Sequence, residues 1–357
     1  KIHGAEFILA NTDSQALNDV RGATMIQIGS DITKGLGAGA DPEKGRQAAL
    51  EAKEELADAI MGADMLFIAA GMGGGTGTGA APVIAQIARD AGILTVAVVS
   101  KPYEFEGSKR MQYAEEGIES LSEWVDSLIV IPNEKLSEVY GGDNSIFSSF
   151  DNANDVLRGA VKGIAEIITI RGFINVDFAD VRTVMSGRGK AMMGSGVASG
   201  SNRANDAVNM ALSSPLLENI DLKNASGVLV NITAGDDLSS KEFSVIGDKV
   251  KEIADDSATI IIGCIKEDDN LGDLRVTIVA TGFDACELES SAENVETDIN
   301  LNEGINQSQN TNINQITSNN IQNGMRAEMI SDVPKEVIAD SDIDDIDVPA
   351  FLRQQAD

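Results

Sequence analysis

The sequence predicts an α/β protein: a Rossmann-like domain with a parallel sheet, a long central helix, a smaller α+β domain and a disordered C-terminal tail. Three observations support this prediction. A glycine-rich loop stands between an apolar strand and a helix. Strand-length apolar runs alternate with helical patterns in the first half of the chain. A strand–helix–strand–strand pattern follows over residues 227–282, which is typical of a small α+β sheet.

The glycine-rich loop, Gly71–Ala80, has six glycines in nine residues. It follows an expected strand over 63–70 and precedes an expected helix over 81–89, with Pro82 near its first turn. Free N–H groups at a helix N-terminus bind anions, and glycine lets the backbone come close to them. We therefore expect this loop to bind phosphate; a plain flexible turn is the alternative.

The loop is not a Walker loop, because no lysine occurs between Gly71 and Ala88. A dinucleotide fingerprint can be fitted to Gly75–Ala80. That fingerprint needs an acid near the end of the next strand to hold a ribose. The next strand, 94–99, ends instead in Ser-Lys-Pro. A NAD-dependent oxidoreductase is therefore the second hypothesis.

Composition bounds the class of protein. The 357 residues suffice for about two domains. The net charge of −30 argues against nucleic acid and against direct binding to anionic lipid. Cys264 and Cys286 give no disulfide framework and indicate a reducing cytoplasm, while a single histidine, His3, excludes a His-rich metal site. We find no apolar run of membrane-spanning length and no signal peptide.

Further polar and glycine-rich segments follow the expected strands. The strand Ala5–Ala10 ends in Asn11-Thr12-Asp13, which either faces a ligand crevice or caps the next helix. A second glycine-rich loop, Lys34–Pro42, precedes a long expected helix, Glu43–Met61. Two such loops suggest more than one phosphate contact.

A ribose and a base also find candidate partners. Glu106 and Arg110 stand four residues apart at a helix start, either as a salt bridge or as a carboxylate and guanidinium beside a ribose. The long helix expected from Asp151 to about Thr169 has Asn154 and Asp155 in its first turn and Phe150 just before it. A ring, an amide and a carboxylate suit a purine, and the carboxylate favours guanine over adenine; the alternative is that the two polar residues complement the helix dipole.

Acidic residues follow the far end of this helix. Its roughly 19 residues span about 28 Å, so Asp177 and Asp180 cannot reach phosphates held at the other end within one molecule. Across a head-to-tail contact they can. The alternative is that Asp177 caps the expected helix over 178–186.

Four motifs together resemble the FtsZ family, the bacterial tubulin-like cell-division GTPases. Gly73–Gly79 resembles the family's signature loop and Asn175–Asp180 its synergy loop, and Ile32–Ala40 and Phe105–Arg110 add to the likeness. The resemblance covers roughly residues 4–283 and the last ten or so. It implies a tubulin/FtsZ-like fold, GTP/GDP with Mg²⁺, and head-to-tail filaments that form the division ring.

The resemblance also assigns roles to residues. It implies that Asp177 and Asp180, helped by Asn175, orient the water that attacks the neighbouring subunit's γ-phosphate, with no protein metal ligands. The residues it assigns to nucleotide binding are Asn11, Ala38, Gly39, Ala40, Gly73, Gly74, Gly75, Thr76, Gly77, Glu106, Arg110, Phe150, Asn154 and Asp155. A non-catalytic scaffold that binds GTP without turnover is the third hypothesis.

One departure from the family concerns the start of the chain. FtsZ chains begin with a strand and a first glycine-rich loop that grips the phosphates, and Lys1 starts after that segment. We expect this chain to bind GTP poorly and the restored segment to rescue binding. The predicted layout is the GTPase domain at 1–150, the central helix at 151–170, the synergy loop and next helix at 171–187, the α+β domain at 188–283, a linker at 284–339 and a terminal peptide at 340–357.

The last segment reads as a disordered linker that ends in a binding peptide. Asn and Gln make up about half of residues 302–323. The peptide resembles the family's terminal motif, which implies binding to membrane-tethering and regulatory division proteins. Its predicted contact residues are Asp347, Val348, Pro349, Phe351 and Leu352. Membrane contact is then indirect, and the expected location is the cytoplasm at the division site under the inner membrane.

Overall fold

The structure is a computed structural model. It describes residues 4–18, 22–140, 145–170, 172–187, 189–214, 216–217, 222–255, 257–267 and 272–283. The linker and the terminal peptide, with their predicted contact residues, lie outside these ranges. Within the described ranges, none of the helices carries the long apolar stretch that crossing a bilayer requires.

The main sheet has seven strands in the order β3-β4-β5-β6-β9-β7-β8. Its strands are β3 (Met65–Gly71), β4 (Leu94–Lys101), β5 (Ser127–Pro132), β6 (Lys190–Ser199), β7 (Gly227–Ala234), β8 (Thr259–Lys266) and β9 (Asp273–Phe283). Strands β3 to β6 run parallel, as do β7 and β8, whereas β9 is antiparallel to both of its neighbours. Two residue pairs, Leu128 with Lys190 and Ile129 with Ala191, join β5 to β6 and thus connect the two parts of the sheet.

A second, two-stranded sheet pairs β1 (Ile8–Asn11) with β2 (Thr24–Gln27) in parallel. Ile8 and Ala10 of β1 pack against the same hydrophobic cluster as Leu66 of β3. The two sheets therefore share one layer of helices, although in the described part of the chain β1 and β3 belong to different sheets.

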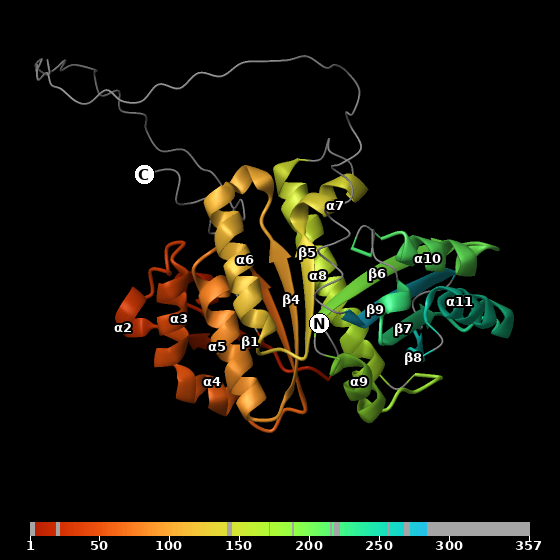
Figure 1. The fold of residues 1–357 in the computed structure, drawn as a ribbon, viewed down its shortest axis with the longest axis horizontal. Helices are drawn as coiled ribbons and strands as arrows, with labels where there is room; N and C mark the ends of the chain where they lie inside the picture. Colours follow the sequence, from red (N-terminus) through yellow and green to blue (C-terminus); the bar gives the residue numbers. More distant parts are fainter. Residues whose placement is uncertain are drawn as a thin grey trace, which may run out of the picture. The chain divides into compact units, whose positions relative to one another are not determined.

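Helices cover these sheets (Figure 1). They are α1 (Ser14–Asn18), α2 (Ser30–Thr33), α3 (Pro42–Glu51), α4 (Lys53–Ile60), α5 (Thr76–Asp90), α6 (Ser108–Ser122), α7 (Asn133–Tyr140), α8 (Ile146–Thr169), α9 (Phe178–Met185), α10 (Arg203–Leu212) and α11 (Ser240–Ile253), with 3₁₀ turns η1 (Glu104–Glu106) and η2 (Leu222–Asn224). Figure 1 shows α8 between the strands β4 and β5 on one side and the strands β6 to β9 on the other. Ile164 and Ile167 of α8 share one core with Ile129 of β5 and Leu229 of β7.

The single helix expected over Glu43–Met61 is wrong, because two helices occupy it. Ala52 leaves the helical conformation at φ −93° and ψ 18° and separates α3 from α4. The buried residues of α3 are small, including Gly45, whereas α4 buries Leu56 and Ile60. A small and a bulky contact face set different distances from a neighbouring helix, so we attribute the break to packing.

Two expected helix starts are also wrong. Helix α5 begins at Thr76, so Pro82 lies inside it rather than near its first turn. Helix α8 begins at Ile146, because the Ser145 hydroxyl caps it by accepting a hydrogen bond from the Ser148 N–H at 3.2 Å. Residues 150, 154 and 155 therefore lie inside α8, and the prediction of a first-turn site is corrected.

The sequence reasoning did not identify α7 or β6. Strand β6 contains Gly194, where an added Cβ would lie only 1.9 Å from the Ala211 carbonyl oxygen of α10. Since α10 lies directly on the strand, glycine is required there by packing. Glycine weakens the usual strand signal in sequence, which explains why this strand was missed.

Candidate functional site

The ends of β1 and β3 come together at the carboxyl edge of the parallel strands. The Thr12 and Thr76 hydroxyls, from the loop after β1 and the start of α5, are hydrogen-bonded at 2.6 Å. Asn11 lies beside them, and its side-chain oxygen accepts from the Asp13 N–H at 3.2 Å. Asp13 in turn accepts from the Gln15 N–H at 2.9 Å, so the helix cap is Asp13. Edges of this kind are where open α/β sheets bind ligands.

The signature loop packs tightly against its two neighbouring segments. A Cβ on Gly75 would lie 2.8 Å from the Ala38 Cβ and 2.9 Å from the Asp41 nitrogen. Gly73 has a φ of +96°, and its Cβ would lie 2.8 Å from the Arg110 carbonyl oxygen. The structure thus brings the second glycine loop and the start of α6 to the signature loop. Only Gly74 of this group has open space where a side chain would stand.

The second glycine loop has two successive residues in the left-handed region. These are Gly39 at φ +59° and Ala40 at φ +53°, and Ala40 is one of two such non-glycine residues in the described chain. Asp41 then caps α3 by accepting from the Glu43 and Lys44 N–H groups at 3.1 and 3.3 Å. The strained loop is therefore held between a buried Ala38 and a well-capped helix.

An aromatic cluster joins the predicted ribose and base residues. The Tyr103 ring stacks on Phe105 at 4.9 Å and meets Phe150 edge-on at 5.4 Å. Glu106 accepts from the Tyr103 N–H at 2.9 Å and from Arg110 at 2.6 Å. The salt-bridge alternative for Glu106 and Arg110 is thus realised, and Tyr103 connects the pair to Phe150.

The two polar residues of α8 are exposed beyond this cluster. Asn154 is open to solvent, and Asp155 pairs with Arg158 at 2.9 Å. Both side chains of that ion pair are more than half exposed, so it is worth little in stability. Asp155 is thus free to exchange this partner for a ligand.

Asn133 is a candidate that the sequence reasoning did not assign. It follows β5 as the first residue of α7, is 5% exposed, and its side-chain oxygen is buried without a hydrogen-bond partner among the described residues. Such an atom costs about 1–3 kcal/mol unless something pairs with it. The available signal was its position, a polar residue directly after the apolar run of β5, just as Asn11 follows the apolar run that ends at Ala10.

The synergy loop is held against the edge of β8. The Phe173 N–H donates to the Cys264 carbonyl at 2.9 Å, and the Cys264 N–H donates to the Ile174 carbonyl at 3.2 Å. Asp177 occupies the N-cap position of α9, but its carboxylate accepts no hydrogen bond from that helix. Asn175, Asp177 and Asp180 are all exposed, so the predicted acids point to solvent without a capping role.

Helix α8 separates these two groups of residues. From Asn154 to its last residue, Thr169, it rises about 22 Å at 1.5 Å per residue. The structure therefore does not bring the acids to the glycine loops of the same molecule.

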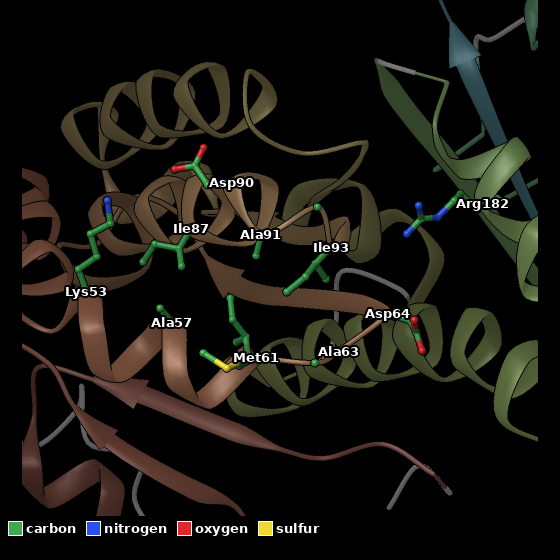
Figure 2. Close-up of a pocket in the computed structure, with 13 residues that line it drawn as sticks. Lys53, Ala57, Met61, Ala63, Asp64, Ile87, Asp90, Ala91, Ile93 and Arg182 are labelled. Carbon is green, nitrogen blue, oxygen red and sulfur yellow. The ribbon is translucent and has the colours of Figure 1, made fainter.

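A cleft of about 690 Å³ lies at the opposite edge of the sheet from the glycine loops. Figure 2 shows Lys53 and Asp90 at one side of it and Asp64 and Arg182 at the other. Ile87 and Ile93 also line it. Since the ligand edge of parallel strands is the carboxyl edge, this cleft is not the nucleotide site.

Comparison with known proteins agrees with this arrangement. Residues 2–141 match the model of the Tubulin/FtsZ family GTPase domain, and residues 189–284 match that of the FtsZ family C-terminal domain. The fold and the glycine loops thus define a tubulin-like GTPase. Cell division protein FtsZ of Pseudomonas aeruginosa is 50% identical over 366 residues, covering 100% of this chain and 91% of the relative. The chain belongs to the FtsZ family.

Two further relatives support the assignment. FtsZ of Coxiella burnetii is 58% identical over 282 residues, covering 79% of this chain and 73% of the relative. A solved structure of an empty FtsZ dimer from M. jannaschii has a TM-score of 0.76 and 45% identity, covering 79% of this chain and 81% of that one. These matches decide for a GTPase that binds GTP and GDP and against the nicotinamide hypothesis.

Proposed function

We propose that this GTPase polymerises head to tail into the filaments of the bacterial division ring, and that each contact between subunits completes an active site. The observation that carries the proposal is the separation of two incomplete halves. The one acid in the two glycine loops, Asp41, is engaged in capping α3. The exposed Asp177 and Asp180 follow the far end of α8, which rises about 22 Å from Asn154 to Thr169. The dimer of the M. jannaschii relative is consistent with self-association.

The division of labour follows from the chemistry of phosphoryl transfer, which requires positioning and charge stabilisation. The loop after β3 and the N-terminus of α5 offer N–H groups to the phosphates. Glu106 and Arg110 contact the ribose side, and the aromatic cluster and Asp155 hold the guanine. The neighbour's Asp177 and Asp180 orient the water that attacks the γ-phosphorus, and the bond to the GDP oxygen breaks.

Magnesium fits this site through the nucleotide. Among the described residues there is no group of three or more His, Cys, Asp or Glu side chains able to hold an ion. Mg²⁺ commonly keeps several waters and binds substrate phosphates with few protein ligands. When bound, it would neutralise phosphate charge, and the protein's own task is to position the nucleotide and the water.

We propose that β1 and β3, which belong to different sheets, can both pair with one more parallel strand. Both strands rest on one helix layer, and their carboxyl ends are tied by the Thr12–Thr76 hydrogen bond. The residues of β1 and most of β3 are half exposed, whereas the adjacent β4 is buried over Leu94–Val99. A strand placed there would bury these residues and carry a further loop to the phosphates.

Location and tail binding follow as proposals from the family. The chain would act in the cytoplasm at the division site. Its terminal peptide would dock through Val348, Phe351 and Leu352 into a groove of membrane-tethering division proteins, as short linear motifs do.

The test is the GTP hydrolysis rate as a function of protein concentration. Specific activity near zero below a threshold and rising above it is expected. The double variant Asp177→Ala plus Asp180→Ala should lose turnover while still binding GTP, and the exposed Asp248→Ala on α11 is the matched control. A specific activity independent of concentration would refute completion between subunits, and full turnover by the double variant would refute the role of the acids.

A further inference from the structure

Gly172 lies where the chain leaves α8 and passes over the edge of β8. A Cβ built on it would stand 2.3 Å from the Cys264 carbonyl oxygen and 3.2 Å from the Ile174 carbonyl oxygen. Contacts below 3.0 Å to backbone atoms do not occur for real side chains, so a substitution would have to move the backbone. The φ of Gly172 lies outside the left-handed region, so the constraint is close approach alone.

A second glycine supports the same loop from the strand side. Gly263 is in β8, and its Cβ would lie 3.2 Å from the Val176 side chain. Val176 stands between Asn175 and Asp177, which are both proposed to act on the neighbour's nucleotide. Gly172 and Gly263 together form a seat, hereafter the glycine seat, on which the synergy loop rests.

Backbone hydrogen bonds also attach the loop to β8. In the described chain, the backbone hydrogen bonds between them are those of Phe173 and Ile174 with Cys264. These bonds fix the loop along the strand. The absence of side chains in the glycine seat then sets how close to the strand the loop lies.

We propose that Gly172 and Gly263 are positioning residues for GTP hydrolysis. The close packing at the glycine seat fixes the position of Asp177 and Asp180 relative to β8, and therefore their distance from the neighbour's γ-phosphate. The inference rests on the proposed function. An alanine at Gly172 must lift the loop by roughly 0.7 Å to bring the 2.3 Å contact to 3.0 Å. Misplacement of about 1 Å costs about 100-fold in rate.

The expected effects are graded. Gly172→Ala should lower the turnover number about 10- to 100-fold, and Gly263→Ala only several-fold, because its 3.2 Å contact is with a side-chain methyl. GTP affinity should stay unchanged in both, because neither residue lies at the glycine loops. Gly247→Ala on α11 is the matched control, since its Cβ would make an ordinary 3.7 Å contact.

Mixing experiments separate positioning from misfolding. Glu106→Ala plus Arg110→Ala damages the nucleotide face but keeps the loop. When the two variants are mixed, some contacts join the intact nucleotide face of a Gly172→Ala chain to the intact loop of a double-variant chain. The mixture should therefore hydrolyse GTP faster than either variant alone. Asp177→Ala mixed with the same double variant is the reference for complementation.

Each outcome is decisive. Full activity of Gly172→Ala alone would overturn the inference, because the loop would not have moved. Failure of Gly172→Ala to be rescued in a mixture that rescues Asp177→Ala would also overturn it, because the damage would not be confined to the loop. Failure of Asp177→Ala itself to be rescued would instead overturn the head-to-tail assignment on which the inference rests.

Discussion

An ion triad centred on the buried Arg203 ties α10 to α11 and yields a quantitative prediction. Arg203, only 4% exposed, donates to Glu242 at 2.7 Å and to Asp237 at 2.6 Å. Glu242 also accepts from the Ser239 N–H at 2.8 Å in the capping box of α11. Replacing Glu242 with Gln keeps an acceptor but removes the charge, and leaves a buried guanidinium with one carboxylate.

The magnitude follows from the pKa of Glu242. The hydrogen bond from Arg203, and then those from Ser239, lower this pKa from 4.5 to about 2 against the opposing effect of burial. A difference of about 2.5 corresponds to about 3 kcal/mol of folding stability. Because the folded-state pKa is lowered, this stability is present above about pH 4.5 and is lost as the pH falls through about 2. At pH 3 only about 1.4 kcal/mol remains.

The assay is urea unfolding of the wild type and Glu242→Gln at pH 7 and pH 3.5. We expect a loss of about 3 kcal/mol at pH 7 that shrinks at the lower pH. Glu43→Gln is the control. The pKa of Glu43 is also lowered to about 2, by Arg46 and Gln47, but its side chain is 56% exposed, so solvent screening should leave stability unchanged. Equal losses for the two variants would refute the argument that burial decides the effect.

Two further predictions concern the nucleotide edge. Gly79→Ala places a Cβ 2.0 Å from the Pro42 carbonyl oxygen and should push α3 and its loop away from the signature loop. We expect titration calorimetry to show a loss of GTP affinity of at least 10-fold. Gly159→Ala, whose Cβ would have no atom within 4 Å, should leave the affinity unchanged. Adding an apolar strand and a glycine-rich loop at the amino end should raise GTP affinity and protect the β1 and β3 amides from hydrogen exchange. Unchanged affinity and unchanged protection would argue against a strand position between β1 and β3.

The sequence predicted the parallel strands and their loops because both leave local signals. Strands β3, β4 and β5 are short apolar runs followed by polar or glycine residues, and these signals do not depend on distant contacts. The start of α8 could not be placed in the same way. Its cap is a single serine, Ser145, ahead of a segment rich in serine and phenylalanine without a clear helical period.

Contacts between residues distant in sequence account for the features of the site that the sequence did not predict. The pairing of Tyr103 with Phe150 and the buried oxygen of Asn133 depend on how α8 and α7 lie over the sheet ends. Spacing along the chain contains no such information. The opposite ends of α8 were nevertheless predictable as separate, because a helix has a fixed rise per residue whatever its neighbours.

The glycines of the signature loop illustrate how one local pattern can have two causes. Gly75 is required because Ala38 and Asp41 approach its Cα, and Gly79 because α3 crosses α5 there. Gly74 alone in this group faces open space, where a phosphate could approach the backbone. A side chain at Gly74 would therefore obstruct the ligand, whereas one at Gly75 would first separate the two loops and one at Gly79 would separate α3 from α5. The glycine richness of the loop thus reflects helix and loop packing as much as phosphate binding.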